Sequence, residues 1–159
     1  MKAFNIFDAT FEYDPEDPDG YHAGMARFGP SIGATRIGAS VYELPPGQAL
    51  CPYHYESDEE WLLVLQGQVT VRHPEGIDVL GPGEVTCFPV GAAGAHKTSN
   101  EGTEPVRMVM LSTKDEPAWT IYPDSNKIGV WTRAGEGARV YRLGTEVDYY
   151  DGETGSAEG

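Results

Sequence analysis

Turn signals that interrupt the chain at short intervals constrain its fold more than any other feature. Apolar runs between residues 36 and 112 are separated by Pro45-Pro46-Gly47, Gly67, Pro74-Glu75-Gly76 and Gly81-Pro82-Gly83. These turns recur at a spacing of roughly 8–12 residues. No window holds a 3.6-residue apolar period over three turns, so long helices are not expected. The pattern is typical of an all-β sandwich or barrel.

The apolar runs between the turns predict the strands. We expect strands at residues 36–44, 51–55, 60–65, 68–73, 77–80, 84–89 and 106–111. In the run from Trp61 to Leu65 every residue is apolar, so this strand is expected to be central and buried on both faces. Asp58 and Glu59, which precede it, are expected to form a solvated turn.

The flanks of this region differ from it in composition. Residues 1–33 are acidic, and two prolines and a glycine interrupt residues 14–20, which predicts an irregular surface arm. Its aromatic residues are expected to pack on the barrel or on a partner subunit; they are Phe4, Phe7, Phe11 and Tyr13. The predicted divisions are an arm at 1–33, a barrel at 34–113, an apolar C-terminal extension at 114–147 that covers the barrel or a dimer interface, and a disordered tail at 148–159.

The charge of the chain excludes several partners. Its 25 acidic and 11 basic residues give a net charge of −14, whereas nucleic-acid binding needs a basic face. An anionic membrane surface is disfavoured for the same reason. The first residues form no apolar signal segment, and no run approaches the ~20 apolar residues of a membrane span. With two cysteines, Cys51 and Cys87, and no disulfide framework, we expect a reduced cytoplasmic protein.

Two segments carry the residues with chemical potential. His54 and Glu56 are two positions apart, so on a strand both side chains share one face, and Glu60 opens the next strand. His96 follows a glycine-rich loop in the second segment. Two histidines and one or two carboxylates inside a barrel form a site for Fe(II), Mn(II), Zn(II) or Ni(II). A bound cation would also offset the cost of burying a carboxylate.

These two segments resemble the paired motifs of the cupin superfamily, G-x5-H-x-H-x3-4-E-x6-G and G-x5-P-x-G-x2-H-x3-N. The matching stretches are Glu60-x6-Gly67, Gly83-x5-Pro89-x-Gly91 and His96-x3-Asn100. The resemblance covers residues 40 to 112 and implies a double-stranded β-helix, or jelly-roll barrel. Residues 122–130 further resemble the C-terminal segment of an uncharacterised branch of small bacterial and archaeal cupins.

The resemblance assigns metal ligation to His54, Glu60 and His96. Glu56 stands where the motif has its second histidine, and two roles are open for it: a fourth ligand, or a general base that hydrogen-bonds near the metal. An alternative register would put Tyr53 and Tyr55 at the histidine positions instead. The register with His54 is preferred because it keeps the spacing from His54 to Glu60.

Function is expected to involve one divalent metal and a small organic molecule. One hypothesis is a metalloenzyme with oxygenase, decarboxylase or isomerase chemistry, in which Glu56 or a metal-bound water handles the proton. The other is a non-catalytic module that binds or senses a sugar or an organic acid. Because the fold hosts many unrelated activities, the resemblance does not choose between them. The family resemblance and the apolar extension together suggest a homodimer.

Overall fold

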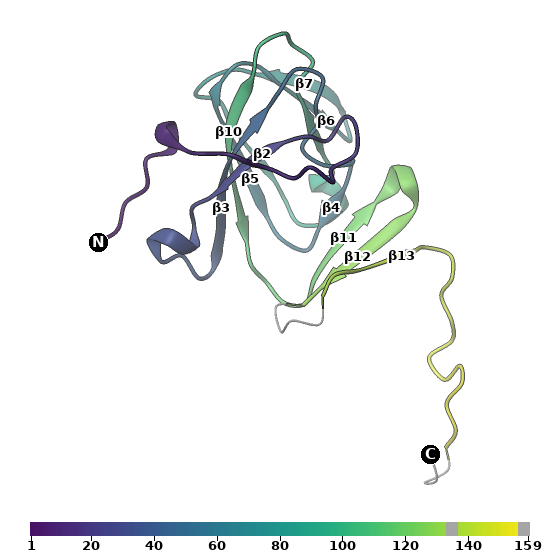
Figure 1. Ribbon diagram of the computed structural model, residues 1–159. Helices are drawn as coiled ribbons and strands as arrows, with labels where there is room; N and C mark the ends of the chain where they lie inside the picture. Colours follow the sequence, from purple (N-terminus) through teal and green to yellow (C-terminus); the bar gives the residue numbers. More distant parts are fainter. Residues whose placement is uncertain (133–136, 156–159) are drawn as a thin grey trace.

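The computed structural model describes residues 1–132 and 137–155 and consists almost entirely of antiparallel strands (Figure 1). The largest sheet has six strands in the spatial order β1 (Glu12–Tyr13), β2 (Gly24–Arg27), β3 (Ile37–Leu44), β10 (Val106–Thr113), β5 (Glu60–Gln66) and β8 (Val85–Phe88). Strands far apart in the sequence are neighbours in it, because β3 pairs with β10 over eight positions and β10 pairs with β5.

Two smaller sheets complete the fold. One contains β7 (Gly76–Leu80), β6 (Val69–His73) and β9 (Lys97–Ser99). The other contains β13 (Arg139–Arg142), β12 (Lys127–Trp131), β11 (Ala118–Tyr122) and β4 (Tyr55–Glu56). The helices are single 3-10 turns: η1 (Ile6–Asp8), η2 (Pro30–Ile32), η3 (Ala92–Gly94) and η4 (Pro123–Ser125). None of the described helices is long and apolar enough to cross a bilayer. The predicted all-β jelly-roll fold is confirmed.

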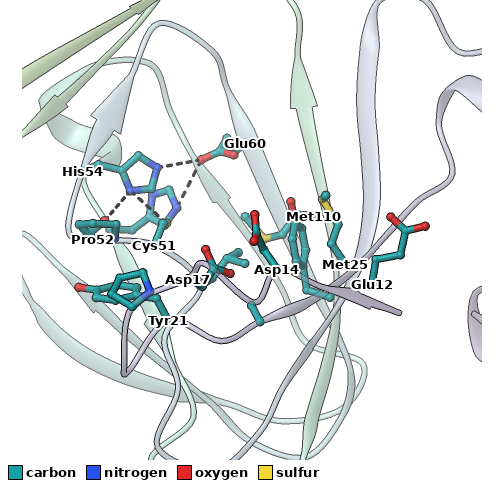
Figure 2. A pocket seen from close by; sticks show the side chains of 15 residues that line it. Glu12, Asp14, Asp17, Tyr21, Met25, Cys51, Pro52, His54, Glu60 and Met110 are labelled. Carbon is teal, nitrogen blue, oxygen red and sulfur yellow. Dashed lines mark hydrogen bonds and ion pairs between the residues drawn. The ribbon is translucent and has the colours of Figure 1, made fainter. Parts of the chain in front are cut away.

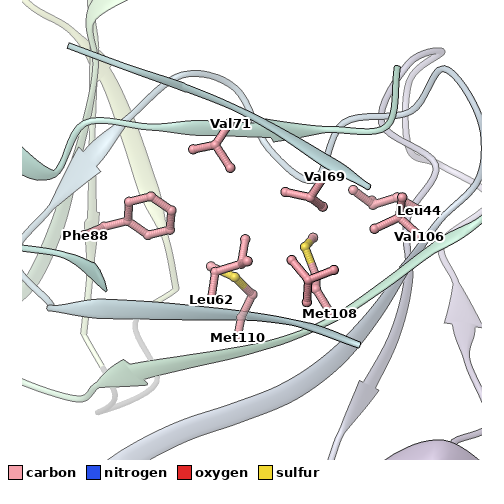
Figure 3. Packing of buried hydrophobic residues seen from close by; sticks show 9 residues of the cluster. Leu44, Leu62, Val69, Val71, Phe88, Val106, Met108 and Met110 are labelled. Carbon is pink, nitrogen blue, oxygen red and sulfur yellow. The ribbon is translucent and has the colours of Figure 1, made fainter. Parts of the chain in front are cut away.

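The hydrophobic core lies between the six-stranded sheet and the sheet that contains β6 (Figure 3). Leu62 and Val64 alternate along β5 and are almost fully buried, and Val69 and Val71 face them from β6. The other members of the core cluster are Leu44, Phe88, Val106, Met108 and Met110. This period of two follows from the strand geometry, which sends alternate side chains to the same face.

The N-terminal arm covers part of the outer face of the six-stranded sheet. Val41 and Val109 form a second buried cluster on that face with Ala26, and Phe11 of the arm packs against it. Phe4 stacks on Phe28 with ring centroids 5.1 Å apart. Trp61 of β5 is 45% exposed. The prediction that β5 is buried on both faces is therefore wrong at Trp61.

Both flanks are more regular than the sequence indicates. β2 lies within the predicted arm and pairs with β3, from Gly24 opposite Glu43 to Arg27 opposite Ser40. The C-terminal extension is not irregular either, because β11, β12 and β13 form an antiparallel sheet whose β11 pairs with β4 of the barrel. In the predicted disordered tail, residues 148–155 are exposed and form no strand, and residues 156–159 lie outside the described residues.

Glu43 on β3 joins the arm to the sheet. Its carboxylate accepts hydrogen bonds from the Tyr13 hydroxyl at 2.6 Å and from Arg107 Nε at 2.7 Å. Partial burial works to raise the pKa of Glu43, but the hydrogen bonds from Tyr13 and Arg107 outweigh it and lower the pKa. Burial and the bond to Glu43 raise the pKa of Tyr13 to about 12. The ionised form of Glu43 therefore stabilises the folded chain.

We predict that Glu43→Gln lowers the free energy of unfolding by about 1 kcal/mol at pH 7, because two charge-assisted contacts are weakened and solvent partly screens them. The pKa of Glu43 is lower in the folded chain than in the unfolded chain. Its ionised carboxylate therefore stabilises the fold above the unfolded-state pKa, and this stability is lost as the pH falls through the folded-state pKa. The difference from wild type should therefore shrink below about pH 4. Urea titrations at several pH values measure it, with the exposed Glu104→Gln as a control. A difference that is independent of pH would contradict this account.

Candidate metal centre

Reciprocal backbone hydrogen bonds bring the two histidines together. The amide of His54 donates to the carbonyl of His96 at 3.0 Å, and the amide of His96 donates to the carbonyl of His54 at 2.8 Å. This antiparallel bridge directs both side chains to the same side, and their ring centroids lie 4.6 Å apart. Glu60, the first residue of β5, pairs with Phe88 of β8, whose ring stacks on His96 at 3.6 Å between centroids. Three separate segments thus converge on one point.

The three ionisable side chains face one another inside the barrel (Figure 2). Glu60 Oε2 lies 3.6 Å from His54 Nε2 and 3.4 Å from His96 Nε2. One potential ligand atom from each residue falls within 4.8 Å of the other two. The side chains are 8%, 3% and 16% exposed for His54, His96 and Glu60. The residues that the sequence predicts as metal ligands are therefore adjacent and nearly withdrawn from solvent.

Backbone carbonyl groups orient both imidazole rings. His54 Nδ1 lies 2.9 Å from the carbonyl oxygen of Pro52, and His96 Nδ1 lies 2.9 Å from that of Gly94. A carbonyl oxygen only accepts, so Nδ1 of each ring carries the proton and Nε2 points its lone pair or a second proton at Glu60. Gly94 is required in this loop, because a Cβ there would overlap the carbonyl oxygen of Pro89. Metal-ligating histidines are commonly held by such a bond from the other ring nitrogen.

Burial and neighbouring charges shift the pKa values of the three groups in different directions. Burial opposes a charge on His54, but Cys51 and Glu60 beside it raise its pKa to about 11. Burial and the charge on His54 lower the pKa of His96 to about 4. Burial works to raise the pKa of Glu60, but the two rings and Glu56 lower it overall. At neutral pH the carboxylate thus faces one charged ring and one neutral Nε2 lone pair.

Glu60 Oε2 provides a direct test of whether a metal fits. Within the described part of the chain this buried oxygen accepts no hydrogen bond of normal geometry. A buried acceptor without a partner costs about 1–3 kcal/mol or more when it is charged. A divalent ion that displaces the proton from His54 Nε2 would bind Glu60 Oε2 and the lone pairs of both Nε2 atoms. Nitrogen and carboxylate oxygen suit Fe, Mn, Zn and Ni. The residues present therefore fit a metal.

Glu56 occupies a neighbouring position. Its Oε2 accepts a hydrogen bond from the Thr120 hydroxyl at 3.0 Å, across the pairing of β4 with β11. Burial, and then the charge of Glu60 beside it, raise the pKa of Glu56 to about 8. It does not belong to the group of three ligand atoms, nor is it among the described residues that line the cavity next to them. Its direct ligation of a metal stays a prediction.

In the alternative motif register Tyr53 and Tyr55 would take the two histidine positions, but both side chains pack against other residues. The guanidinium of Arg72 lies over the ring of Tyr53, 3.9 Å from its centroid. Tyr55 meets Trp119 edge-on, with centroids 6.1 Å apart. Each tyrosine thus contacts a side chain outside the cluster, whereas His54 lies beside His96.

Asp58 is a site-supporting residue that the sequence analysis misplaces. It is only 9% exposed and accepts hydrogen bonds from the Thr113 hydroxyl and the Asp115 amide, both at 2.8 Å. These bonds tie the turn before Glu60 to the end of β10. The expectation of a solvated turn is wrong for Asp58, since nothing in the local pattern shows that residues more than fifty positions away supply its donors.

An open cavity of about 570 Å³ adjoins the three residues (Figure 2). His54, Glu60 and His96 contribute to its wall together with Cys51, Tyr42 and Met110 of the barrel. The opposite wall belongs to the N-terminal arm, from which Glu12, Asp14, Asp17 and Tyr21 line the cavity. The volume suits a small organic ligand. The sequence does not show the arm's contribution, because long-range contacts such as the pairing of β2 with β3 bring the arm to the site.

Solved structures share this architecture. A candidate sugar phosphate isomerase from Acidithiobacillus ferrooxidans is 22% identical, with a TM-score of 0.80 over 93% of this chain and 94% of its own. A cupin-superfamily sugar phosphate isomerase from Silicibacter pomeroyi is 19% identical, with a TM-score of 0.79 over 93% and 98%. The polyketide cyclase RemF from Streptomyces resistomycificus is 21% identical, with a TM-score of 0.62 over 74% and 83%. At these identities the likeness shows the fold alone.

Sequence comparison identifies a family for the central segment of the chain. No curated protein sequence matches it significantly. The family model of the cupin domain matches residues 40–112, the segment that runs from β3 to β10 and contains His54, Glu60 and His96. The predicted motifs and the jelly-roll sheets agree with this match, which identifies residues 40–112 as a cupin domain.

Proposed function

We propose that the protein holds one divalent metal ion through His54, Glu60 and His96 and acts as an enzyme on a small organic molecule in the adjoining cavity. The observation that carries the proposal is the buried Glu60 Oε2, which lacks a hydrogen-bond partner among the described residues and faces two Nε2 atoms at 3.4 and 3.6 Å. Three protein ligands leave coordination positions for water or substrate, as catalytic sites require.

The chemistry proposed is of the isomerase type, in which a proton moves between neighbouring carbon atoms of the substrate. A bound metal would supply Lewis acidity toward a substrate oxygen. The chain's residues would hold the substrate beside it, in the cavity between the arm and the barrel wall. Support comes from the two solved structures named above as isomerases, which match nearly the whole chain. Oxygenase and decarboxylase chemistry, and a non-catalytic binding module, are the competing possibilities that turnover experiments separate.

Glu56 is proposed to position Glu60 rather than to ligate the metal. Its carboxyl interacts with Glu60 on one side and accepts from Thr120 on the other. Such contacts to a ligating carboxylate set its orientation.

The homodimer also stays a proposal. On the outer face of the six-stranded sheet Trp61, Val85 and Leu111 are 45%, 55% and 37% exposed. They extend the apolar surface that the arm covers elsewhere, and a second copy would withdraw them from water.

The first prediction concerns metal content. Protein purified without a histidine tag should contain about one Fe, Mn, Zn or Ni per chain by elemental mass spectrometry. Glu60→Gln and His96→Ala each remove a proposed ligand and should weaken metal binding more than about 100-fold, which exceeds the effect expected for a residue outside the ligand set. His73→Gln, a histidine of β6 away from the site, should keep the metal. Equal metal content in all four proteins would refute the proposed centre.

The second prediction separates the two roles of Glu56. If Glu56 positions Glu60, Glu56→Gln can still hydrogen-bond to both Glu60 and Thr120, and metal affinity should stay within about threefold of wild type. Glu56→Ala removes both contacts and should weaken binding about 10- to 100-fold. Competition titrations with a chromophoric chelator measure both affinities. An equal large loss in Glu56→Gln and Glu56→Ala would instead identify Glu56 as a ligand.

The third prediction tests catalysis. Metal-loaded protein is incubated in D2O with small aldoses, ketoses and amino sugars, and proton NMR follows the signals next to the carbonyl carbon. An isomerase exchanges these hydrogens for deuterium, and metal-free protein and Glu60→Gln should do so at least about 100-fold more slowly. Ligand-induced thermal shifts without exchange or conversion would favour the binding module.

A further inference from the structure

We infer that the ligand of this cavity carries a positively charged amine in addition to oxygen atoms that bind the metal, and that Asp14 and Asp17 of the arm select it. The inference rests on the proposed metal site and names the substrate class that this site accepts. It depends on which charges line the cavity and on which of them are already neutralised by neighbours.

The wall opposite the metal ligands is acidic. Glu12, Asp14 and Asp17 line it, and none of the described residues that line the cavity is lysine or arginine (Figure 2). Lys97 lies over the ring of Tyr21, 5.6 Å from its centroid, but does not itself line the cavity. Glu60 balances one of the two charges of a bound divalent metal, and the three carboxylates of the arm exceed the single positive charge that remains.

These carboxylates are available for a ligand. Asp17 is half-buried, and its carboxylate has no ion pair or side-chain hydrogen bond within residues 1–132 and 137–155. The carboxylate of Asp14 is exposed, and among the described residues it accepts a local hydrogen bond from the amide of Glu16 at 2.9 Å. The arginine ion pairs in the same ranges lie elsewhere, with Asp124 and Glu43. A half-buried carboxylate beside an open cavity gains most from a cation that enters that cavity.

The positive charges near the centre lie around a different cavity. A hollow of about 410 Å³ is lined by Arg27 and Lys114, and it shares Tyr42, Glu60 and Met110 with the acidic cavity. Tyr42 and Met110 therefore lie in the wall that the acidic cavity and the basic hollow share, and Glu60 lines both. An anionic ligand such as a sugar phosphate would be repelled from the arm's side, so the substrate class of the similar solved structures does not carry over to this cavity.

Three hydroxamates test the inference, because they share one metal-binding group and differ in the charge of the other end. Glycine hydroxamate carries an ammonium, acetohydroxamate is neutral, and malonic acid monohydroxamate carries a carboxylate. Isothermal titration calorimetry measures the affinity of each for the metal-loaded protein. The same titrations are made with Asp14→Asn/Asp17→Asn and with Asp148→Asn/Asp151→Asn, which removes equal charge from the C-terminal segment that extends away from the barrel (Figure 1).

Wild type and the C-terminal control should bind the ammonium probe about tenfold more tightly than the neutral probe, and the carboxylate probe more weakly still. Asp14→Asn/Asp17→Asn should reduce these ratios to about one, and raised ionic strength should shrink them in wild type. Binding without this order, or an order that survives Asp14→Asn/Asp17→Asn, overturns the inference and leaves the metal centre standing. Tighter binding of the carboxylate probe would assign the ligand to the basic cavity. A wild-type protein without metal would overturn the metal centre and the inference together.

Discussion

The buried Glu60 carboxylate between two imidazole rings is the interaction on which the rest of the site depends. One backbone bridge places His54 and His96 side by side, and two carbonyl groups turn their Nε2 atoms toward Glu60. Asp58 holds the preceding turn against the end of β10. Each of these contacts restricts one of the three proposed ligand side chains in the folded chain. Most of the conformational entropy of these side chains is therefore lost on folding rather than on binding an ion.

Strand pairing beyond the cupin motifs shapes what surrounds that centre. β2 carries the arm onto the six-stranded sheet, and Glu43 joins Tyr13 of the arm to Arg107 of β10. β11 pairs with β4 and brings Thr120 to Glu56. The jelly roll thus supplies the proposed ligands, whereas the flanks supply one wall of the cavity and the Thr120 contact to Glu56. This division explains how one fold can carry many activities.

The sequence predicts the barrel and the meeting of His54, Glu60 and His96, because turn residues and motif spacing are local signals. It mispredicts what depends on distant partners. Trp61 is 45% exposed, and Asp58 is buried where Thr113 and Asp115 donate to it. Alternation along a strand predicts that Glu56 shares a face with His54; His54 forms its bridge to His96 directly before β4, and both Glu60 and His54 act on the carboxyl of Glu56.

The pairing of β4 with β11 also bears on how cupins are compared with one another. Residues 40–112 contain all three proposed ligands, yet Asp14, Asp17 and Thr120 lie outside that segment. Two chains with the same motif residues can therefore diverge in substrate preference through their flanks alone, while the alignment of their shared domain stays unchanged. Grouping such proteins by activity requires the residues that precede and follow the barrel to be aligned as carefully as the motifs themselves.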